Sequence, residues 1–510
     1  MGSGFAGSLL AMIARQLGRS VVLIERGSHP RVVIGESSTP LSNLLLEELA
    51  ERYNLDALRP LARWGSWQRA YPEVVCGLKR GFTFYHHRLG SPNPPDPQRR
   101  DQLLVAASPR DEIADTHWYR ADFDHWLVRE AQRIGVDYLD RAHMQEIHDE
   151  DSEVVLTGAH CGEELTIRAR FLVDATGPRG FLHHALKLGD GALPGFPATQ
   201  ALYSHFSGVR RFEQTWAFRS EETPPYPVDD AAVHHVFDGG WIWVLRFNNG
   251  ITSAGVAAMD RLASDLGLGE GRPAWERLLA QIPALHEQFD GARVEQSFRH
   301  IPQLSFRCAT ITGPRWALLP SAAGFVDPLL STGFPLTLLG VSRLAEIIAQ
   351  TWNTPAFHSR LQTYAEQTDQ ELLVTARLVG ALYANMNNFP LFAALSLLYF
   401  AAASYSEAAR RLGKSHLASS FLLCSHPVFG PASARLFDRA LHRLTESESS
   451  ELVRDILSVL EPFNIAGLGR AERRNWYPVE AGDLIENAHK LEATGYEVFA
   501  MLKRCGFSPP

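Results

Sequence analysis

The chain has 510 residues, of which 45% are hydrophobic and 21% are charged. This is the composition of a folded globular protein that is long enough for two or three domains. The formal net charge is −8, and no strong basic run is present, which argues against nucleic acid as a partner. The five cysteines lie far apart and form no CxxC pair, so we expect neither a metal site nor a disulfide framework.

A cytoplasmic protein without a membrane span is the simplest interpretation of these features. The first residues lack the basic and apolar regions of a signal peptide. The most apolar stretch, residues 389–403, contains Pro390 and is too short to cross a bilayer comfortably. We expect a buried helix there, and the alternative is a segment that faces a membrane surface or a hydrophobic substrate. The sequence does not indicate an oligomeric state.

A glycine loop opens the chain and reads Gly-Ser-Gly-Phe-Ala-Gly over residues 2–7. A helix with an apolar stripe follows, then a strand over residues 20–24 and an acid about where a carboxylate binds a ribose hydroxyl. This order predicts a dinucleotide-binding loop, whose glycines let the backbone approach a pyrophosphate at the helix N-terminus. A glycine-rich loop in an unrelated α/β protein is the alternative. The predicted contacts are Gly2, Gly4, Phe5, Ala6, Gly7 and Glu25.

The next part of the chain alternates between helical and strand-like patterns. Residues 122–134 predict a helix, residues 136–139 a strand, and residues 154–167 a hairpin. A proline-rich stretch at residues 91–97 predicts a surface loop.

The later part of the chain changes from short strands to helices. Residues 198–310 alternate between apolar and polar side chains, as in an antiparallel sheet, and the pattern is helical from about residue 341. We therefore expect an α/β fold. A doubly wound nucleotide-binding core with an inserted antiparallel β-sheet layer occupies residues 1–345, and a mostly helical C-terminal domain occupies residues 346–510.

Three further motifs favour FAD as the dinucleotide. Residues 119–124 read Tyr-Arg-Ala-Asp-Phe-Asp, residues 173–177 read Val-Asp-Ala-Thr-Gly, and residues 322–328 read Ala-Ala-Gly-Phe-Val-Asp-Pro. They resemble the R-x-x-F-D element, the DATG turn and the flavin-side segment of aromatic-hydroxylase-type FAD proteins, and we expect the third to open a helix. Ser321 stands where that fold family has an aspartate that binds the ribityl chain, and a serine hydroxyl also accepts a hydrogen bond. The added FAD contacts are Arg120, Asp174, Ala175, Gly177, Ser321, Gly324, Asp327 and Pro328.

The segment around Lys79 is the most discriminating one. Residues 76–84 read Cys-Gly-Leu-Lys-Arg-Gly-Phe-Thr-Phe, residues 35–40 read Gly-Glu-Ser-Ser-Thr-Pro, and residues 240–243 read Gly-Trp-Ile-Trp. Together with Asp-Pro-Leu-Leu-Ser-Thr-Gly at residues 327–333, they resemble the flavin-dependent halogenase family, including its tryptophan halogenase-like relatives. The resemblance implies a catalytic Lys79, flavin contacts at Ser37, Ser38 and Thr39, halide contacts at Ser331, Thr332 and Gly333, and a tunnel past Trp241 and Trp243.

The chemistry implied by this resemblance is halogenation that depends on FADH₂ and O₂, with FADH₂ supplied by a separate flavin reductase. A chloride or bromide ion attacks the flavin hydroperoxide, and the resulting hypohalous acid passes through a closed tunnel to Lys79. A lysine in a dry passage has a depressed pKa, which makes its amine a nucleophile or a directed donor. A solvated strand residue is the alternative for Lys79, and aromatic core packing is the alternative for Trp241 and Trp243.

Two departures from the family pattern bear on the reaction and the substrate. Leu245 and Arg246 replace the Ile-Pro of the W-x-W-x-I-P signature. A monooxygenase or other flavin oxidoreductase therefore stays open, as does a flavin-binding protein without turnover. Leu330 stands where tryptophan halogenases have a glutamate that polarises the oxidant. We expect a small electron-rich aromatic substrate of the phenol or pyrrole type, free or carrier-tethered, rather than free tryptophan.

The glycine loop normally follows a strand, and no such strand precedes it here. A parallel sheet buries its first strand on both faces, and each buried Val or Ile contributes about 1.5–3 kcal/mol. We expect that this strand is missing, and that an N-terminally extended form binds FAD more tightly and melts at a higher temperature. The C-terminal domain is expected to close the substrate side, with a packed helical core as the alternative role of its aromatic residues.

Overall fold

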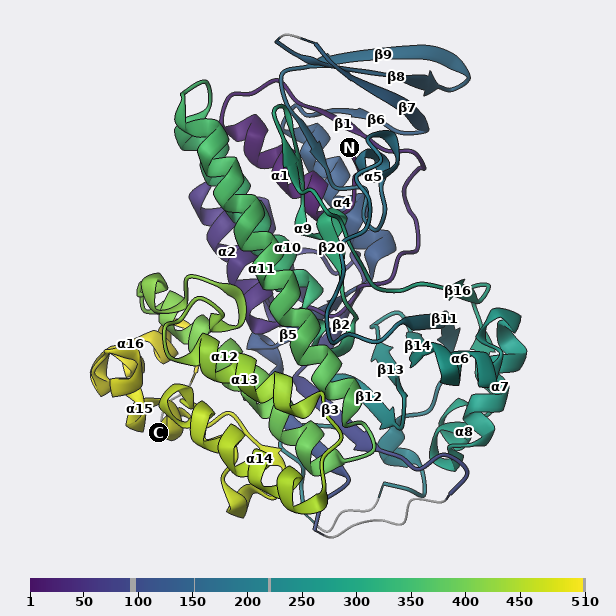
Figure 1. Ribbon diagram of the computed structural model, residues 1–510, viewed down its shortest axis with the longest axis vertical. Coiled ribbons are helices and arrows are strands. Elements are labelled where there is room, and N and C mark those ends of the chain that lie inside the picture. The colour runs from purple at the N-terminus through teal and green to yellow at the C-terminus, as the bar shows by residue number, and fades with distance from the viewer. Residues whose placement is uncertain (92–97, 151, 219–221, 508–510) are drawn as a thin grey trace.

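The computed structural model describes residues 1–91, 98–150, 152–218 and 222–507 (Figure 1). Its several sheets, covering helices and helical C-terminal part confirm the predicted α/β fold class. In Figure 1 the β7-β8-β9 sheet lies at one end of the molecule and the C-terminal helices lie at the other. The surface loop predicted at residues 91–97 lies almost wholly outside the described residues.

The nucleotide-binding part begins with helix α1 (Phe5–Gln16), which follows Gly4 directly. Three residues of its predicted apolar stripe are buried in the main core, namely Leu9, Leu10 and Ile13. Burial of this stripe fixes the direction of the helix, so its N-terminus stays next to the glycine loop.

Two separate small sheets lie in this part, each with one parallel strand pair, and a gap lies between them. Within the described residues, β1 and β10 each have one strand neighbour. The predicted strand at residues 20–24 is present but shorter. The pairs are β1 (Val22–Ile24) with β6 (Asp137–Leu139), and β10 (Leu172–Asp174) with β19 (Trp316–Leu318).

Met1 and Gly2 bridge this gap at one end. The Met1 amino group donates to the Val173 carbonyl oxygen (2.9 Å), and the Ala175 N–H donates back to Met1 (2.8 Å), which is the pattern of a parallel strand pair. On the other side, the Gly2 N–H donates to the Ile24 carbonyl oxygen (2.8 Å). The rest of the gap is a cavity of about 420 Å³ between β1 and β10.

The largest sheet has the strand order β15-β11-β14-β13-β12-β3-β4-β21. The antiparallel pairing predicted within residues 198–310 is confirmed for β11 to β14. The bounds are β3 (Gly81–His86), β4 (Gln102–Ala106), β11 (Thr199–Ser207), β12 (Ala232–Phe237), β13 (Gly240–Arg246), β14 (Ile251–Met259), β15 (Arg293–Val294) and β21 (Trp476–Tyr477).

Part of the interval predicted as sheet is helical, which corrects that prediction. Trp275, Leu278 and Leu285 repeat at helical rather than strand spacing, and they pack on Ile242 and Val256 of the sheet. These side chains are buried in a second apolar core, and this burial favours helices in the interval. The helices are α6 (Asp260–Leu266), α7 (Arg272–Ala280) and α8 (Pro283–Phe289).

The helix expected at residues 322–328 begins later, at Gly333, which corrects a second prediction. Residues 320–331 form a short helix α9 (Pro320–Ala323), a two-residue strand β20 (Gly324–Phe325) and a turn η5 (Leu329–Ser331). Leu330 and Ser331 have φ angles of 63° and 55°. These left-handed conformations are incompatible with a right-handed helix, so α10 starts after them.

The C-terminal part is helical as predicted, and it also adds strand β21 to the largest sheet beside β4. Two helical segments, Leu329–Thr351 and Phe389–Arg411, are long and apolar enough to cross a membrane, and 72% and 83% of the most apolar 18-residue window in each are buried in the fold. Core helices share these properties. The helices are α10 (Gly333–Thr351), α11 (Ala356–Ala384), α12 (Phe389–Arg411), α13 (Phe429–Ala440), α14 (Glu446–Leu460), α15 (Ala481–Glu486) and α16 (Gly495–Arg504).

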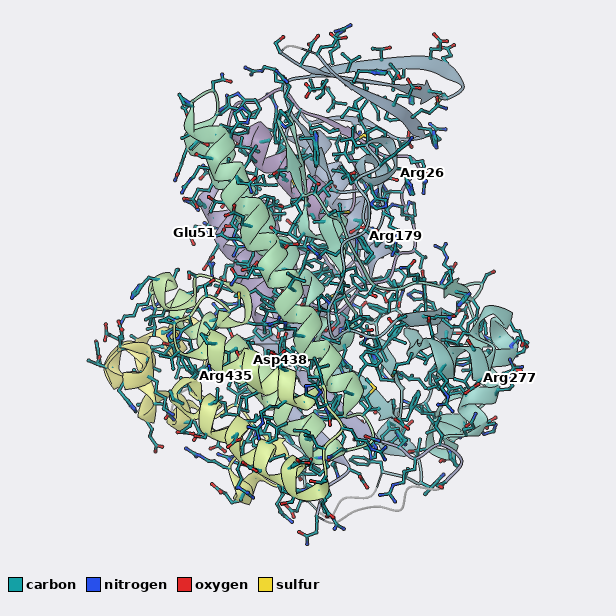
Figure 2. The ribbon with its side chains drawn as sticks, viewed as in Figure 1. Arg26, Glu51, Arg179, Arg277, Arg435 and Asp438 are labelled. Carbon is teal, nitrogen blue, oxygen red and sulfur yellow. The ribbon has the colours of Figure 1, made fainter. Side chains whose placement is uncertain are left out.

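The remaining elements lie around the candidate site or at the surface of the molecule. The predicted helix at residues 122–134 is α4, and the predicted hairpin is β8 with β9. Exposed charges of both signs, such as Arg26, Glu51 and Arg277, lie over separate parts of the surface (Figure 2). The bounds are α2 (Pro40–Arg52), α3 (Trp64–Ala70), α4 (Arg120–Arg133), α5 (Phe181–Ala185), β2 (Cys76–Lys79), β5 (Asp115–Trp118), β7 (Ala142–Asp149), β8 (Val154–His160) and β9 (Glu163–Ala169).

The cavity between β1 and β10 has room for further chain, which gives a testable prediction. An extension of five apolar residues before Met1 is expected to pair with both strands and raise the melting temperature, because each buried Val or Ile contributes about 1.5–3 kcal/mol. Thermal unfolding with and without FAD measures this. An extension of the same length made of glycine and serine is the control, and equal melting temperatures for the two would contradict the prediction.

Candidate active site

Glu25 follows β1 and lies against the glycine loop. Its carboxylate accepts hydrogen bonds from the Ser3 N–H (3.1 Å), the Ser3 hydroxyl (2.9 Å) and the Gly27 N–H (3.0 Å). Burial opposes its ionisation, but Arg31 at 3.4 Å and the N–H groups outweigh burial and lower the pKa of Glu25. The position predicted for ribose binding therefore holds an ionised carboxylate.

The glycine loop also touches the turn after β10. Gly2 has a φ of +87°, and a Cβ at this position would lie 2.5 Å from the Ala175 carbonyl oxygen, so a larger residue does not fit. The buried Asp174 carboxylate accepts a hydrogen bond from the Thr176 N–H at 2.8 Å. Asp174 therefore holds the turn itself. The Ala175 backbone is occupied by Met1 and Gly2, and of the residues predicted in this turn Gly177 has open space beside it.

Two guanidinium groups lie near the N-terminus of α1. Arg120 makes a two-point ion pair with Asp124 (both 2.8 Å) and donates to the Gly35 carbonyl oxygen at 2.9 Å. A Cβ on Gly4 would lie 3.4 Å from Arg120 Nη2, 3.7 Å from Arg31 Nη2 and 3.7 Å from Asp124 Oδ2. Two cations, one carboxylate paired with Arg120, and the positive end of the helix dipole therefore meet at Gly4, and the cations and the dipole are the features that favour a pyrophosphate there.

Lys79 is the last residue of β2 and is fully buried, so its interpretation as a solvated residue is wrong. Its Nζ donates to the Ser37 hydroxyl (2.8 Å) and to the Ser38 carbonyl oxygen (2.5 Å). It also lies 3.8 Å from the centre of the Phe82 ring, a distance at which a cation interacts with an aromatic face. The amine thus binds the loop that resembles the family's flavin-side loop.

The strands around Lys79 explain its position. β2 pairs antiparallel with β5, and the loop at residues 37–38 lies along the other edge of β5, where the Ser38 hydroxyl donates to the Thr116 carbonyl oxygen at 2.7 Å. A Cβ on Gly77 would lie 2.0 Å from the Arg246 carbonyl oxygen. The glycine before Lys79 therefore allows β2 to pack directly on the end of β13.

Asp115 is the cross-strand partner of Lys79 in the β2–β5 pair. Burial lowers the pKa of Lys79, and the nearby Asp115 charge opposes this shift. Burial likewise raises the pKa of Asp115, and Lys79 opposes that shift. The two groups therefore influence each other's protonation, although no direct hydrogen bond joins them among the described residues. The sequence analysis missed Asp115, because no motif marks it and only the strand register brings it to Lys79.

Trp241, one of the two predicted tunnel residues, binds the segment predicted to contact flavin and halide. Its indole N–H lies 3.2 Å from Asp327 Oδ1 and 3.2 Å from the Tyr383 hydroxyl oxygen. The Tyr383 hydroxyl donates to Asp327 Oδ2 at 2.9 Å. Burial raises the pKa of Asp327 to about 7, and these donors reduce the shift. Strand β13 and helix α11 thus fix Asp327 from two sides.

The predicted halide segment is a tight turn ahead of α10. The Ser331 N–H already donates to the Pro328 carbonyl oxygen (3.0 Å), and the Tyr399 hydroxyl donates to the Leu330 carbonyl oxygen (2.9 Å). Among the described residues, the Thr332 and Gly333 N–H groups have no backbone acceptor outside their helix. Of the three predicted halide contacts, these two amides at the start of α10 are the ones left to bind an anion.

The other predicted residues are less closely connected to this group. Trp243 donates to the Ser253 hydroxyl (3.3 Å) within the large sheet and lies 5.7 Å from Trp241, measured between ring centres. Ser321 is half-buried in α9, and Thr39 caps α2 by accepting a hydrogen bond from the Ser42 N–H at 3.2 Å.

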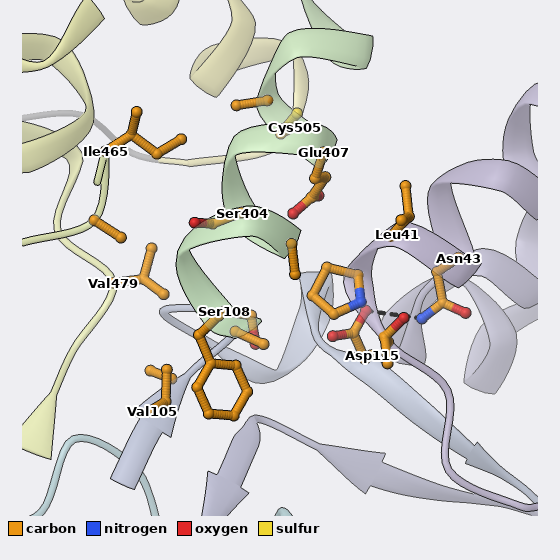
Figure 3. Close-up of a pocket in the computed structure, with 18 of the residues that line it drawn as sticks. Leu41, Asn43, Val105, Ser108, Asp115, Ser404, Glu407, Ile465, Val479 and Cys505 are labelled. Atoms are coloured by element: carbon orange, nitrogen blue, oxygen red, sulfur yellow. Dashed lines mark hydrogen bonds between the residues drawn. The ribbon is translucent and has the colours of Figure 1, made fainter. Parts of the chain in front are cut away.

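A cavity of about 160 Å³ lies beside Asp115, between the sheet and the C-terminal helices (Figure 3). Figure 3 shows the Asp115 side chain joined to Asn43 of α2 by a hydrogen bond. Leu41, Phe82 and Phe400 are among its apolar lining residues. The C-terminal part therefore forms one wall of this cavity, and the other wall carries the partner of Lys79.

Known proteins share both this sequence and this fold. The sequence pattern of the tryptophan halogenase family matches residues 114–388. The monodechloroaminopyrrolnitrin halogenase PrnC of Pseudomonas fluorescens is 29% identical over 407 residues, which cover 78% of this chain and 70% of that protein. The tetracycline 7-halogenase of Kitasatospora aureofaciens is 28% identical over 402 residues, with coverages of 77% and 70%. The solved structure of halogenase PltM with phloroglucinol and FAD has a TM-score of 0.80 and 22% identity, and the match covers 93% of this chain and 98% of that one.

A glycine loop at the start of a helix, combined with a buried lysine bonded to the loop at residues 37–38, is the arrangement expected of a flavoenzyme of the halogenase class. The match over more than half of its length shows that the chain belongs to the tryptophan halogenase family. The predicted resemblance to flavin-dependent halogenases is therefore confirmed, together with the expected fold and the FAD-dependent enzyme class. The roles of the individual site residues stay predictions.

The buried Asp327 predicts a specific dependence of stability on pH. Its pKa is raised to about 7 in the folded state, so the folded protein binds an extra proton between the unfolded pKa and pH 7. Wild-type stability from this group is present at low pH and is lost as the pH rises to about 7. The free energy of unfolding of Asp327→Asn, relative to wild type, should therefore rise by up to roughly 4 kcal/mol between pH 4 and 7.

Denaturant unfolding of both proteins at several pH values measures this difference. Asp265→Asn, which removes an exposed carboxylate from α6, is the control. A difference between Asp327→Asn and wild type that stays flat over this range would contradict a protonated Asp327.

Proposed function

We propose that this protein halogenates an electron-rich aromatic substrate of the phenol or pyrrole type, using FADH₂, O₂ and a halide ion, with Lys79 as the residue that delivers the halogen. The observation that carries the proposal is the fully buried Lys79 amine, bonded to Ser37 and Ser38 of the flavin-side loop. A lysine is buried in this way only where its amine has a partner or a task, because desolvation of the charge is costly.

The residues at the glycine loop fit FAD. Gly4 leaves the N-terminus of α1 open to a pyrophosphate between Arg120 and Arg31, and Glu25 is an ionised acceptor for a ribose hydroxyl. The backbone at Gly177 and the loop at residues 37–39 are the further predicted contacts. Reduced FAD, when bound, supplies with O₂ the oxidising power that converts a halide ion to hypohalous acid.

Lys79 is suited to orient that acid. A protonated amine has three N–H donors, and two of them are used by Ser37 and Ser38. The third is available to the oxygen of hypohalous acid, and donation to it makes the halogen more electrophilic. As the carbon–halogen bond forms, the oxygen–halogen bond breaks. The hydroxide that leaves combines with the proton lost from the ring carbon to give water.

The substrate class rests on the environment of Leu330 and on the relatives. Leu330 is fully buried and carries no charge, so it gives no polarising help to the oxidant, and an already activated ring needs less. The names of the relatives include a tetracycline halogenase and a halogenase of pyrrole-2-carbonyl groups on a peptidyl carrier protein. We include in the proposal a free or carrier-tethered substrate, a separate flavin reductase, and a cytoplasmic location, which the five free cysteines favour.

Mass spectrometry of electron-rich arenes tests this function directly. Purified protein is incubated with FAD, a flavin reductase, NADH, O₂ and bromide, and with phenol or pyrrole-2-carboxylate as substrate. Replacement of a ring hydrogen by bromine supports the proposal. Addition of one oxygen atom instead would assign the protein to the flavin monooxygenases, and failure to bind FAD in a titration would remove every enzymatic interpretation.

Substitution of Lys79 tests its role. Lys79→Met keeps the length of the buried side chain but removes the donor, and bromination should fall by roughly 10²–10⁴-fold, the usual contribution of a positioned proton donor. Oxidation of FADH₂ by O₂ should continue at the wild-type rate. Lys503→Ala, which removes an exposed lysine from α16, is the control. Bromination by Lys79→Met within a few fold of wild type would exclude Lys79 as the halogen-delivering group.

A further inference from the structure

The cavity beside Asp115 has the size of a single aromatic ring. Its volume is about 160 Å³, and an apolar cavity of about 150 Å³ in another protein accepts benzene. Apolar side chains from four elements surround it: Leu41 of α2, Phe82 of β3, Val105 of β4 and Phe400 of α12. A planar ring of this size is therefore the ligand that the apolar part of the cavity fits.

Most polar groups that line the cavity are already paired. Glu407 accepts from Arg411 at 2.8 Å, and Arg63 donates to Glu47 at 3.2 Å. The Thr39 hydroxyl is bonded to the Ser42 hydroxyl at 2.7 Å. Each of these groups already has a hydrogen-bond or ion-pair partner, so none of them needs one from a ligand.

Three polar atoms of residues on the same lining are buried and have no hydrogen-bond partner among the described residues: Asp115 Oδ2, Asn43 Oδ1 and Ser108 Oγ. Asn43 Oδ1 is a pure acceptor, and Asp115 Oδ2 is one when its carboxyl group is ionised; Asp115 is only 7% exposed. A buried polar atom without a partner costs about 1–3 kcal/mol, so a ligand that satisfies such an atom gains affinity. A ligand that pairs with these atoms must supply a hydrogen-bond donor, because most of the three unpaired atoms are acceptors.

Asp115 is also held in a fixed orientation. Asn43 Nδ2 donates to Asp115 Oδ1 at 2.8 Å, which leaves Oδ2 as the free oxygen. The residue lines the cavity and is at the same time the cross-strand partner of Lys79. A ring bonded to Oδ2 would therefore lie close to the strand from which Lys79 projects.

From this geometry we propose that Asp115 Oδ2 accepts a hydrogen bond from the O–H or N–H group of the aromatic substrate, so that the cavity selects a single ring with a directly attached donor. The proposal rests on the proposed function for its link to halogenation, and it goes beyond it by naming the recognition group. The donor orients the ring, and its hydrogen bond to a carboxylate pushes electron density into the ring that the halogen attacks.

Ligand binding to the purified protein tests this without flavin or turnover. Phenol and its methyl ether, anisole, have similar shapes, but only phenol has a donor. Calorimetric titration at a pH above the raised pKa of Asp115 should show that wild type prefers phenol by roughly tenfold or more, as expected for a hydrogen bond to a charged acceptor. In Asp115→Asn this preference should fall to within about threefold. The new amide can still bind Asn43, whose Oδ1 is free to accept, so the fold is expected to persist.

Two further variants keep the test decisive. Glu130→Gln, which alters a buried carboxylate in α4 away from the cavity, should keep the wild-type preference. Ala403→Phe, which fills the cavity from α12, should abolish binding of both ligands, whatever the state of Asp115. Circular dichroism and melting temperatures establish that each variant is folded.

The outcomes separate this inference from the proposed function. No phenol preference in wild type, an unchanged preference in Asp115→Asn, or full binding by Ala403→Phe would each overturn the inference, even if the wild type brominates phenol. A preference that depends on Asp115 in a protein that never brominates any arene would support the recognition role and overturn the proposed function instead.

Discussion

The burial of one lysine is the constraint on which the rest of the site depends. A charged amine away from water is costly unless donors and acceptors around it replace hydration. Here the replacements are the Ser37 hydroxyl, the Ser38 carbonyl oxygen, the Phe82 ring and the Asp115 charge. These groups come from separate segments of the chain, so satisfying one side chain requires those segments to be assembled around β5. The arrangement of the candidate site is in this sense a result of electrostatic compensation.

The same logic applies on the other side of the site. Asp327 is fully buried and is held by Trp241 from β13 and Tyr383 from α11. The turn that follows is strained at Leu330 and Ser331, and Tyr399 of α12 holds it. Strain of this kind persists where surrounding contacts over-determine the backbone. The large sheet and the C-terminal helices therefore act as a rigid frame that keeps an otherwise unfavourable turn in place.

The sequence predicts the parts of this protein that depend on local patterns. The glycine loop, the helix after it, the hairpin of β8 and β9, and the halogenase-like motifs are all readable, because their spacing reflects backbone geometry. Helices α6 to α8 were mistaken for sheet, since a tertiary apolar core decided their structure. Asp115 had no signal, because its importance comes from a strand register and from a cavity wall more than 280 residues away at Phe400. Hydrophobic periodicity reports local structure, so it does not predict contacts between residues this far apart in the sequence.

Strand β21 has a consequence for how the protein is made. The Trp476 side chain donates to Gln102, 374 positions earlier in the chain, and its strand pairs with the edge of β4. Until this late segment is synthesised, β4 has an open edge, and open edges invite pairing with other chains. Residues of α16 also line the cavity. A nascent chain therefore contains Lys79 and Asp115 long before it contains the segments that cover the edge of β4 and complete the cavity wall.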